Sequence, residues 1–180
     1  MTTTRRFVAD DMFKFNNVNL DYYTETYNIP FYFEYLATWP EYFYTVETPH
    51  EGTVMGYVMG KVEGDKPRKK WHGHVTALTV APEYRRLGLA KKLMFLLEEI
   101  TDKIHKAYFV DLFVRVSNRI AIGMYEKLGY TTYRRVLNYY SGKNGEDGFD
   151  MRKAMPLDPK KLSMIPLGRD IYPEELESTL

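Results

Sequence analysis

The sequence predicts an α/β (α+β) fold in which a central mixed sheet is flanked by helices. In the later part of the chain, apolar segments of strand length alternate with segments of helical periodicity, which is typical of sheets covered by helices. Hydrophobic residues make up 44% of the 180 residues, enough for the core of one domain. The chain shows no internal repeat and no low-complexity segment, so we expect one domain, with or without a tail.

The first forty residues predict one strand followed by two helices. The strand is expected at residues 3–7, "TTRRF". Asp10 and Asp11 are N-cap candidates for a helix that continues to about Leu20. The second helix is expected over residues 30–39, "PFYFEYLATW", because a proline suits its first turn and another proline follows its end.

Three strands and a long helix are expected next. Residues 42–47 and 53–64 form two strands joined by the turn "TPHEG", and residues 72–80, "HGHVTALTV", form the third. A helix then runs over residues 88–103. Its apolar side chains recur at the spacing of one buried face, namely Leu89, Leu93, Leu96, Leu97 and Ile100.

The last part of the chain continues the alternation. A dense apolar strand covered on both faces, a helix and two further strands are expected over residues 107–116, 118–128, 130–140 and 149–155. Gly129 ends the helix, because glycine is the common C-terminal stop signal. The segment beyond residue 155 has too little periodicity to assign. We therefore divide the chain into a domain over residues 1–155 and a C-terminal tail over residues 156–180.

Composition excludes several classes of function. Lys and Arg number 25 against 24 Asp and Glu, so no excess charge favours nucleic acid or an anionic membrane. The absence of cysteine excludes disulfides, thiolate zinc sites and a cysteine nucleophile. No apolar run approaches the roughly 20 residues of a membrane helix, and "MTTTRRFVADD" lacks the apolar core of a signal peptide. We expect a cytoplasmic protein with no direct contact to nucleic acid or membrane.

Aromatic residues are unusually frequent. They make up 16% of the chain, with 16 Tyr and 10 Phe, and they crowd into residues 21–44. Such a segment can fill a core, or it can form a surface for a partner, because Tyr and Trp give much contact area at little entropy cost. We expect a mixture of the two.

The segment "RRLGLA", residues 85–90, lies where a strand gives way to a helix. Backbone N–H groups at a helix start bind anions, and the helix dipole adds to this. Gly88 and Ala90 allow a ligand close to the backbone, and Arg85 and Arg86 add charge and paired donors. The segment fits a diphosphate, although it is neither a P-loop nor a G-x-G-x-x-G dinucleotide motif. Alone, it could equally be a basic turn with a helix-entry glycine.

A second motif follows at residues 118–130, and its fixed positions are Asn118, Ala121, Tyr125, Gly129 and Tyr130. By itself Tyr125 could simply pack an amphipathic helix on the sheet. Together with residues 85–90, however, the motif resembles the GNAT superfamily of acetyl-CoA-dependent N-acetyltransferases. That superfamily has a pyrophosphate loop Q/R-x-x-G-x-G/A and a later helix N-x-x-A-x-x-x-Y that ends in G-[FY].

The resemblance implies the GNAT fold, with a mixed and mostly antiparallel sheet flanked by helices. It also implies acetyl-CoA as cosubstrate and no metal. The residues it places against acetyl-CoA are Leu78, Val80, Arg85, Arg86, Gly88, Leu89, Ala90, Asn118 and Tyr125. Tyr125 is the catalytic candidate, because it matches the family's position for the group that protonates the leaving CoA thiolate.

Longer stretches are similar to the catalytic subunits of NatB-type N-terminal acetyltransferases, among them "NVNLDYYTETYNIPFY" and "WHGHVTALTVAPEYRRLGLA". The similarity implies acetylation of the α-amine of nascent proteins that begin Met-Asp, Met-Glu, Met-Asn or Met-Gln. It also implies a large helical-repeat auxiliary subunit, through which the enzyme docks on the ribosome.

The chemistry of an α-amine suits this assignment. An α-amine has a pKa of about 7.7–8.0, whereas a lysine amine is near 10.4, so a weak base or a water relay suffices. The neutral amine then attacks the thioester directly in a ternary complex, without a covalent enzyme intermediate.

His74 is the second catalytic candidate and also a substrate-binding one. It shares a strand face with Thr76, and both can hydrogen-bond a side chain that lies over the strand. Two other interpretations exist for His72 and His74: a metal pair, which lacks further ligands at suitable spacing, and a structural pair bonded to backbone. The resemblance adds Glu25, Tyr27, Tyr139 and Tyr140 to the substrate site, with Glu25 either receiving the amine or lying exposed on a loop.

Other functions are compatible with the fold. One is acetylation of lysine or of a small amine, and another is a non-catalytic module that keeps CoA as a structural ligand and binds a partner. The aromatic residues Tyr27, Tyr139 and Tyr140 favour a peptide with a hydrophobic first residue, and intact Tyr125 and His74 favour catalysis.

Overall fold

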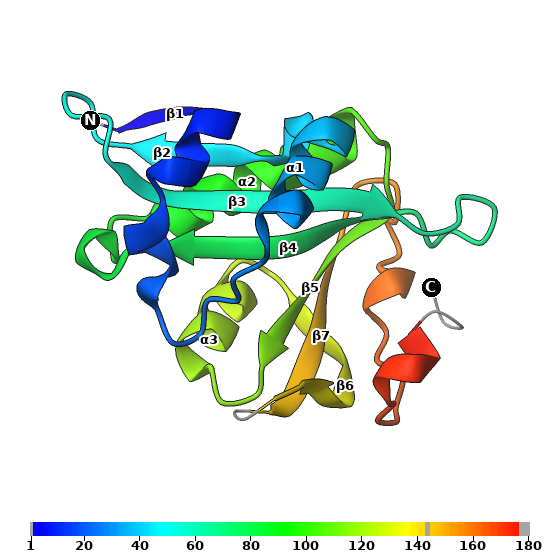
Figure 1. The fold of residues 1–180 in the computed structure, drawn as a ribbon. Helices are drawn as coiled ribbons and strands as arrows, with labels where there is room; N and C mark the ends of the chain where they lie inside the picture. The colour runs from blue at the N-terminus through cyan, green and yellow to red at the C-terminus, as the bar shows by residue number, and fades with distance from the viewer. Residues whose placement is uncertain (1, 143–144, 177–180) are drawn as a thin grey trace. The chain divides into compact units, whose positions relative to one another are not determined.

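The computed structural model describes residues 2–142 and 145–176 (Figure 1). The chain divides into two compact units. The first comprises Met1–Lys61 and Val75–Ile100, and the second comprises Val62–His74 and Thr101–Leu180. Strands β3 (Val54–Glu63) and β4 (His72–Val80) and helix α2 (Leu89–Lys103) each contribute residues to both units.

The first unit carries strands in the order β1-β2-β3-β4, with β1 (Thr3–Arg6) and β2 (Tyr44–Glu47) as its first two. β2 pairs antiparallel with both β1 and β3. Helix α1 (Ile29–Thr38) begins as the sequence predicts, because the Asn28 side chain accepts a hydrogen bond from the Phe31 amide at 3.0 Å and Pro30 lies in the first turn. Helix α2 is also confirmed, and Leu89, Leu93, Leu97 and Ile100 are buried on one face.

An aromatic core holds the first unit together. Phe7 stacks on Phe43 with ring centroids 4.0 Å apart, and Phe15 meets Tyr32 and Tyr57 edge to face at 5.3 Å. Burial of each such ring stabilises the fold by about 1.5–3 kcal/mol. The crowded segment of residues 21–44 contributes to this core and also to the surface: Tyr32, Tyr35, Tyr42 and Phe43 are buried, whereas Tyr22, Ile29 and Phe33 are exposed.

The predicted helix from Asp10 to Leu20 is wrong. The structure has two short 3-10 helices instead, Ala9–Phe13 and Asn16–Leu20. The Asp11 carboxylate accepts the Val8 amide at 2.9 Å and pairs with Arg5 at 2.7 Å, so this buried aspartate fixes the turn from within. Phe15 packs into the core between the two turns, and these tertiary contacts override the sequence pattern.

The second unit carries the strand order β5-β7-β6, with β5 (Phe109–Arg115), β6 (Thr131–Tyr140) and β7 (Glu146–Ala154). β7 pairs antiparallel with both neighbours. It begins three residues before the predicted position 149, because Gly148 pairs with Arg115 on one side and Val136 on the other. Helix α3 (Arg119–Lys127) is confirmed, and it ends before Gly129, whose φ of 95° only glycine adopts readily.

The segment after residue 155 follows the outer strand β6. The Leu137 amide donates to the Ile171 carbonyl at 2.8 Å, and the Ile171 amide donates to the Arg135 carbonyl at 3.1 Å. Ile171 is fully buried. The division between residues 155 and 156 stays a prediction. Within the described residues, no helix combines the length and apolar character that crossing a membrane requires.

Candidate active site

The loop of residues 85–90 presents an open backbone at the start of α2. Arg86 has a φ of 66° and Gly88 a φ of 77°. Two residues with a left-handed backbone conformation, separated by one residue, therefore lie immediately before the helix. Such turns direct successive N–H groups toward one side and bind anions there. A Cβ built on Gly88 would meet no described atom within 4 Å. The loop therefore has room for a ligand against its backbone, as a diphosphate requires.

The two arginines of this loop have different surroundings. The Arg85 Nε donates to the Val80 carbonyl at 3.1 Å, and its guanidinium pairs with Asp21 at 2.8 Å. Arg85 thus ties the loop to the end of β4 and to the N-terminal segment. Arg86 is exposed, and its charge faces solvent beside the loop.

The remaining cofactor candidates of the first unit are apolar. Leu89 and Val80 are buried, whereas Leu78 and Ala90 are half-buried. A buried side chain leaves only the backbone for a ligand, so Leu89 can serve an anion through its N–H group.

The second motif, residues 118–130, lies on helix α3 and at its two ends. The Asn118 side chain accepts the Ala121 amide at 3.2 Å and caps the helix. Its side-chain oxygen is therefore used within the chain, which leaves its amide for a ligand. Tyr125 is 7% exposed and meets the Tyr130 ring edge to face at 5.9 Å. Burial raises the pKa of Tyr125 above its ordinary value of 10, so its hydroxyl keeps its proton at neutral pH and can donate it.

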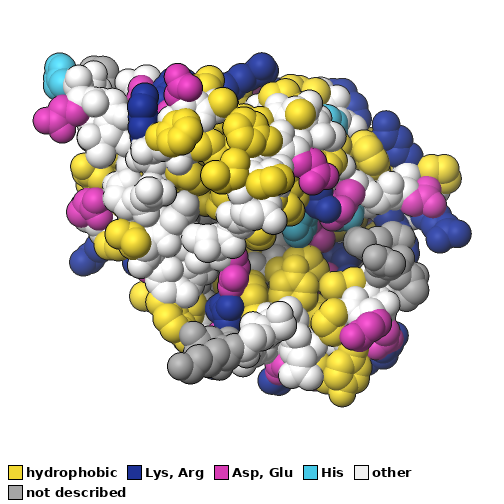
Figure 2. Space-filling view, viewed as in Figure 1, with side chains coloured by type: hydrophobic (Ala, Val, Ile, Leu, Met, Phe, Trp, Pro, Cys, Tyr) yellow, Lys and Arg dark blue, Asp and Glu magenta, His cyan; other side chains and the backbone are white. Residues whose placement is uncertain are grey.

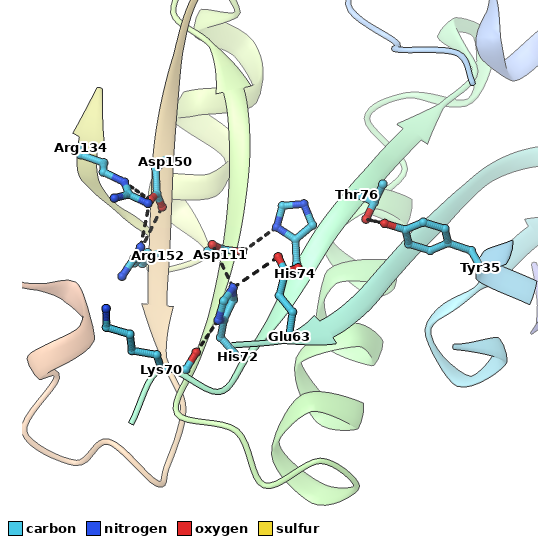
Figure 3. Close-up of polar contacts among 10 residues, drawn as sticks. All are labelled: Tyr35, Glu63, Lys70, His72, His74, Thr76, Asp111, Arg134, Asp150 and Arg152. Carbon is cyan, nitrogen blue, oxygen red and sulfur yellow. Dashed lines mark hydrogen bonds and ion pairs between the residues drawn. The ribbon is translucent and has the colours of Figure 1, made fainter. Parts of the chain in front are cut away.

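A buried aspartate joins the two histidines of β4 (Figure 3). Asp111 of β5 contacts the His74 Nδ1 through Oδ1 at 2.7 Å and approaches the His72 Nε2 through Oδ2 at 3.4 Å. His72 donates its Nδ1–H to the Lys70 carbonyl at 2.6 Å and stacks on Phe109 at 4.6 Å. The structural interpretation therefore fits His72, whereas His74 is bonded to a carboxylate.

Opposing effects set the protonation of this cluster. Burial alone would raise the pKa of Asp111, but its interactions with His72 and His74 hold it well below its usual range. Burial lowers the pKa of His72, and the Asp111 carboxylate outweighs this, so the net change is upward. Asp111 is thus an ionised carboxylate at neutral pH.

Aromatic rings connect His74 to the predicted tyrosines of β6. The His74 ring lies 5.8 Å from Phe113, which stacks on Tyr139 at 4.4 Å. Tyr139 in turn meets Tyr140 edge to face at 4.9 Å. The structure therefore brings His74, Tyr139 and Tyr140 into one aromatic series within the second unit.

A bulge in β6 orients these tyrosines. Pairing with β7 shifts register between Val136 and Tyr140, and Asn138 between them has a φ of 54°. The Asp147 carboxylate accepts the Asn138 amide at 2.8 Å and holds this left-handed residue in place. Gly148 lies under the Tyr139 ring, since a Cβ there would approach it to 3.1 Å.

The first unit holds the other substrate candidates. The Tyr27 hydroxyl donates to the Thr76 carbonyl at 3.3 Å, and the Thr76 hydroxyl donates to the Tyr35 hydroxyl at 2.8 Å. Thr76 and Tyr27 are therefore in contact, and the Thr76 O–H is already donated to Tyr35. Glu25 is exposed, and its charge contributes, after burial, to raising the pKa of Tyr27.

Sequence reasoning missed Asp111, Tyr35 and Phe113. A signal existed for Asp111, because it is the only acidic residue in the apolar segment "AYFVDLFVRV", and a charge in such a strand must find partners. Tyr35 and Phe113 gave no such signal among many other rings. As for metals, residues 2–142 and 145–176 contain no group of three or more His, Asp and Glu side chains that could hold an ion.

Comparisons with known proteins identify the family of the chain. The model of the acetyltransferase (GNAT) family matches residues 12–130. The chain is 64% identical, over 98% of its own length and 99% of the relative's, to the N-terminal acetyltransferase B complex catalytic subunit NAA20 of Arabidopsis thaliana.

Similar solved structures point to the same family. The chain resembles Chaetomium thermophilum Naa20 in complex with a bisubstrate analogue, with a TM-score of 0.87 and 41% identity over 96% of this chain and 97% of that one. It also resembles a chain of the NatB acetyltransferase complex bound to CoA and MES, with a TM-score of 0.77 and 44% identity over 86% and 99% of the two chains. The α/β fold predicted from the sequence is confirmed, and the chain belongs to the GNAT acetyltransferase family, among relatives that are catalytic subunits of N-terminal acetyltransferase B.

Proposed function

We propose that the chain is the catalytic subunit of a NatB-type N-terminal acetyltransferase. It transfers the acetyl group of acetyl-CoA to the α-amine of proteins that begin Met-Asp, Met-Glu, Met-Asn or Met-Gln. The observation that carries the proposal is the 64% identity to a NatB catalytic subunit along nearly the full length of both chains. The open loop before α2 supports the binding of acetyl-CoA, and the series of rings around His74 supports the binding of the peptide.

The loop of residues 85–90 fits the diphosphate of acetyl-CoA. The space beside the Gly88 backbone is open. The start of α2 supplies N–H donors, and the Arg86 side chain adds positive charge. Acetyl-CoA, when bound, supplies the thioester that is cleaved. We also assign Leu78 and Val80 of β4, and Asn118 and Tyr125 of the second unit, to acetyl-CoA.

The transfer itself needs little from the protein. The neutral amine nitrogen bonds to the thioester carbon, the carbon–sulfur bond breaks, and the amine proton passes to water or to Glu25. The leaving thiolate takes the proton of the Tyr125 hydroxyl, which burial keeps protonated, and Tyr125 regains a proton from water before the next turnover. No covalent intermediate is required, and the chain has no cysteine to form one.

The peptide is recognised through its first two side chains. We assign the flexible, apolar Met side chain to the rings of Tyr27 in the first unit and of Tyr139 and Tyr140 in the second. The second side chain meets His74 and Thr76 of β4, which offer polar atoms to an Asp, Glu, Asn or Gln.

A large helical-repeat auxiliary subunit completes the proposed enzyme and carries it to the ribosome in the cytoplasm. The similar NatB structure is described as a complex. The chain also exposes large apolar side chains near its N-terminus. The exposed fractions of Phe13, Leu20 and Tyr22 are 84%, 83% and 67%. Hydrophobic side chains gather on the face drawn in Figure 2, and such surfaces commonly mark partner contacts.

A peptide panel varied only at the second residue tests the proposal. Met-Asp, Met-Glu, Met-Asn and Met-Gln peptides are expected to exceed Met-Leu and Met-Lys by about ten- to hundredfold in kcat/KM. A Leu or Lys side chain, which has no acceptor oxygen, would leave a hydrogen-bond donor of the site unpaired, at about 1–3 kcal/mol. His74→Ala should remove much of this preference while acetyl-CoA binding persists. Equal turnover of Met-Leu and Met-Asp peptides by the wild type would contradict the specificity and favour a broad amine acetyltransferase.

Arg86→Glu should weaken acetyl-CoA binding by about tenfold or more, because reversing a charge beside the diphosphate changes its interaction by at least about 1.4 kcal/mol. Calorimetry with CoA measures the effect. Arg68→Glu, the same change on the exposed loop between β3 and β4, is the matched control and should bind CoA like the wild type. Unchanged affinity of Arg86→Glu would remove this residue from the diphosphate site.

A further inference from the structure

The ring of His74 has one nitrogen fixed by the chain and one available to a ligand. Its Nδ1 lies 2.7 Å from Asp111 Oδ1, and the side chains of His74 and Asp111 are 13% and 2% exposed. Because Asp111 is an ionised carboxylate, it can only accept hydrogen bonds. The proton of a neutral His74 is therefore on Nδ1, and Nε2 carries a lone pair.

This tautomer determines what Nε2 can do. In neutral His74, Nε2 accepts a hydrogen bond but cannot donate one. A carboxylate likewise only accepts, so neutral His74 and an Asp or Glu side chain have no hydrogen bond to make. Protonated His74 donates from Nε2, and then a carboxylate is a good partner. An amide serves either form, because it carries both N–H donors and a carbonyl oxygen.

We propose that Asp111 is a positioning residue that sets the specificity of the site. It fixes His74 in the Nδ1–H tautomer and accepts from Nδ1 in the protonated ring as well, so that acidic second residues are bound through protonated His74 and amide second residues through either form. This proposal rests on the proposed function, in which His74 meets the second residue of the peptide.

The surroundings of Asp111 are consistent with this role. His72 on β4 uses its Nδ1–H on the Lys70 carbonyl, and its Nε2 has no hydrogen-bond partner among the described residues. Glu63 of β3 lies 3.7 Å from the same nitrogen. Asp111 and Glu63 therefore both favour the protonated form of His72. His74 has Asp111 as its carboxylate partner.

The other charges near Asp111 are paired with one another. Asp150 of β7 contacts Arg134 of β6 at 2.8 Å and Arg152 of β7 at 3.0 Å (Figure 3). Phe113, which faces the His74 ring, carries no charge. The cluster around His74 thus comprises Asp111, His72 and Glu63, with the Asp150 group beyond them.

The wild-type enzyme tests the proposal without any substitution. Met-Asp and Met-Asn peptides compete in one reaction, from about pH 6 to 8.5, so that the product ratio gives the ratio of kcat/KM. The Asp side chain, with a pKa of about 3.9, stays ionised throughout. The Met-Asp to Met-Asn ratio should rise as the pH falls across this range, by up to about tenfold per pH unit. Met-Glu against Met-Gln repeats the test, and the α-amine titration of each peptide, followed by NMR, corrects for their basicity.

Asp111→Asn tests the residue itself. Its amide oxygen can still accept the Nδ1–H, but its negative charge is gone. The kcat/KM for Met-Asp should fall about tenfold or more relative to that for Met-Asn. Glu63→Gln is the matched control, because it removes a carboxylate that contacts His72 and not His74, and it should keep the wild-type pH profile. Circular dichroism and CoA binding verify that each variant folds.

Nitrogen-15 NMR of the histidine rings gives a readout that does not depend on activity. The His74 signals, identified from their loss in His74→Ala, should show the Nδ1–H tautomer at pH 8.5. An Nε2–H tautomer, or a Met-Asp to Met-Asn ratio that is constant with pH and unchanged in Asp111→Asn, would overturn the proposal. Failure of the proposed function looks different, since neither peptide would then exceed a Met-Lys peptide.

Discussion

Tyr125→Phe is expected to lower kcat by about 10²- to 10⁴-fold and to leave acetyl-CoA affinity close to that of the wild type. Loss of a general acid has an effect of this size. The hydroxyl is the group removed, while the ring keeps its buried place against Tyr130. Because burial raises the pKa of Tyr125, the proton is available throughout the range in which the α-amine titrates.

The measurement is the pH profile of kcat with a Met-Asp peptide, together with calorimetry of CoA binding. Tyr133→Phe is the matched control, since its ring lies against Arg152 at 3.5 Å and has no proposed part in the transfer. If kcat of Tyr125→Phe equals that of the wild type across the profile, water or another donor protonates the thiolate.

Asp150→Asn is expected to destabilise the protein by about 3–5 kcal/mol, because breaking a buried ion pair from one side leaves uncompensated charge. Asp150 is fully buried and receives hydrogen bonds from Arg134 at 2.8 Å and from Arg152 at 3.0 and 3.1 Å. Burial raises the pKa of Asp150, and the charge of Arg152 opposes this. With three N–H donors on its two oxygens, we take it as ionised at neutral pH.

Urea unfolding measures the difference. Asp65→Asn removes a carboxylate from the exposed pair with Arg68, 3.4 Å apart, and should cost no more than about 1 kcal/mol. Loss of the same small amount in both variants would mean that the buried cluster contributes no more than a surface pair.

Most of the fold could be predicted from the sequence because its elements carry strong local signals. Strands β4 and β5 are apolar runs in the sequence. Helix α3 has an N-cap residue and a terminal glycine at the expected spacing. The helix predicted after Asp10 is absent because Asp11 bonds to Arg5 and Val8. Arg5 is itself held by Glu47, 42 residues away, and no local pattern encodes that pair. β7 begins early for a similar reason, since two neighbouring strands pair with residues that alone would form a turn.

The candidate site could be predicted only as a set of residues. Motif spacing pointed to Gly88 and Tyr125, and the structure gives each a setting that fits the proposed chemistry. The partners that determine protonation are far apart in sequence. Asp111 follows His74 by 37 residues, so the tautomer of the histidine could not be inferred before the strands were placed side by side.

The location of the acetyl group on a product peptide tests the central claim most directly. A Met-Asp peptide with an internal lysine is incubated with acetyl-CoA and the chain, alone and with its auxiliary subunit, and the product is fragmented by mass spectrometry. Acetyl groups confined to the α-amine of Met are the predicted result. Acetylation of the lysine side chain, or none in either preparation, would contradict an N-terminal acetyltransferase.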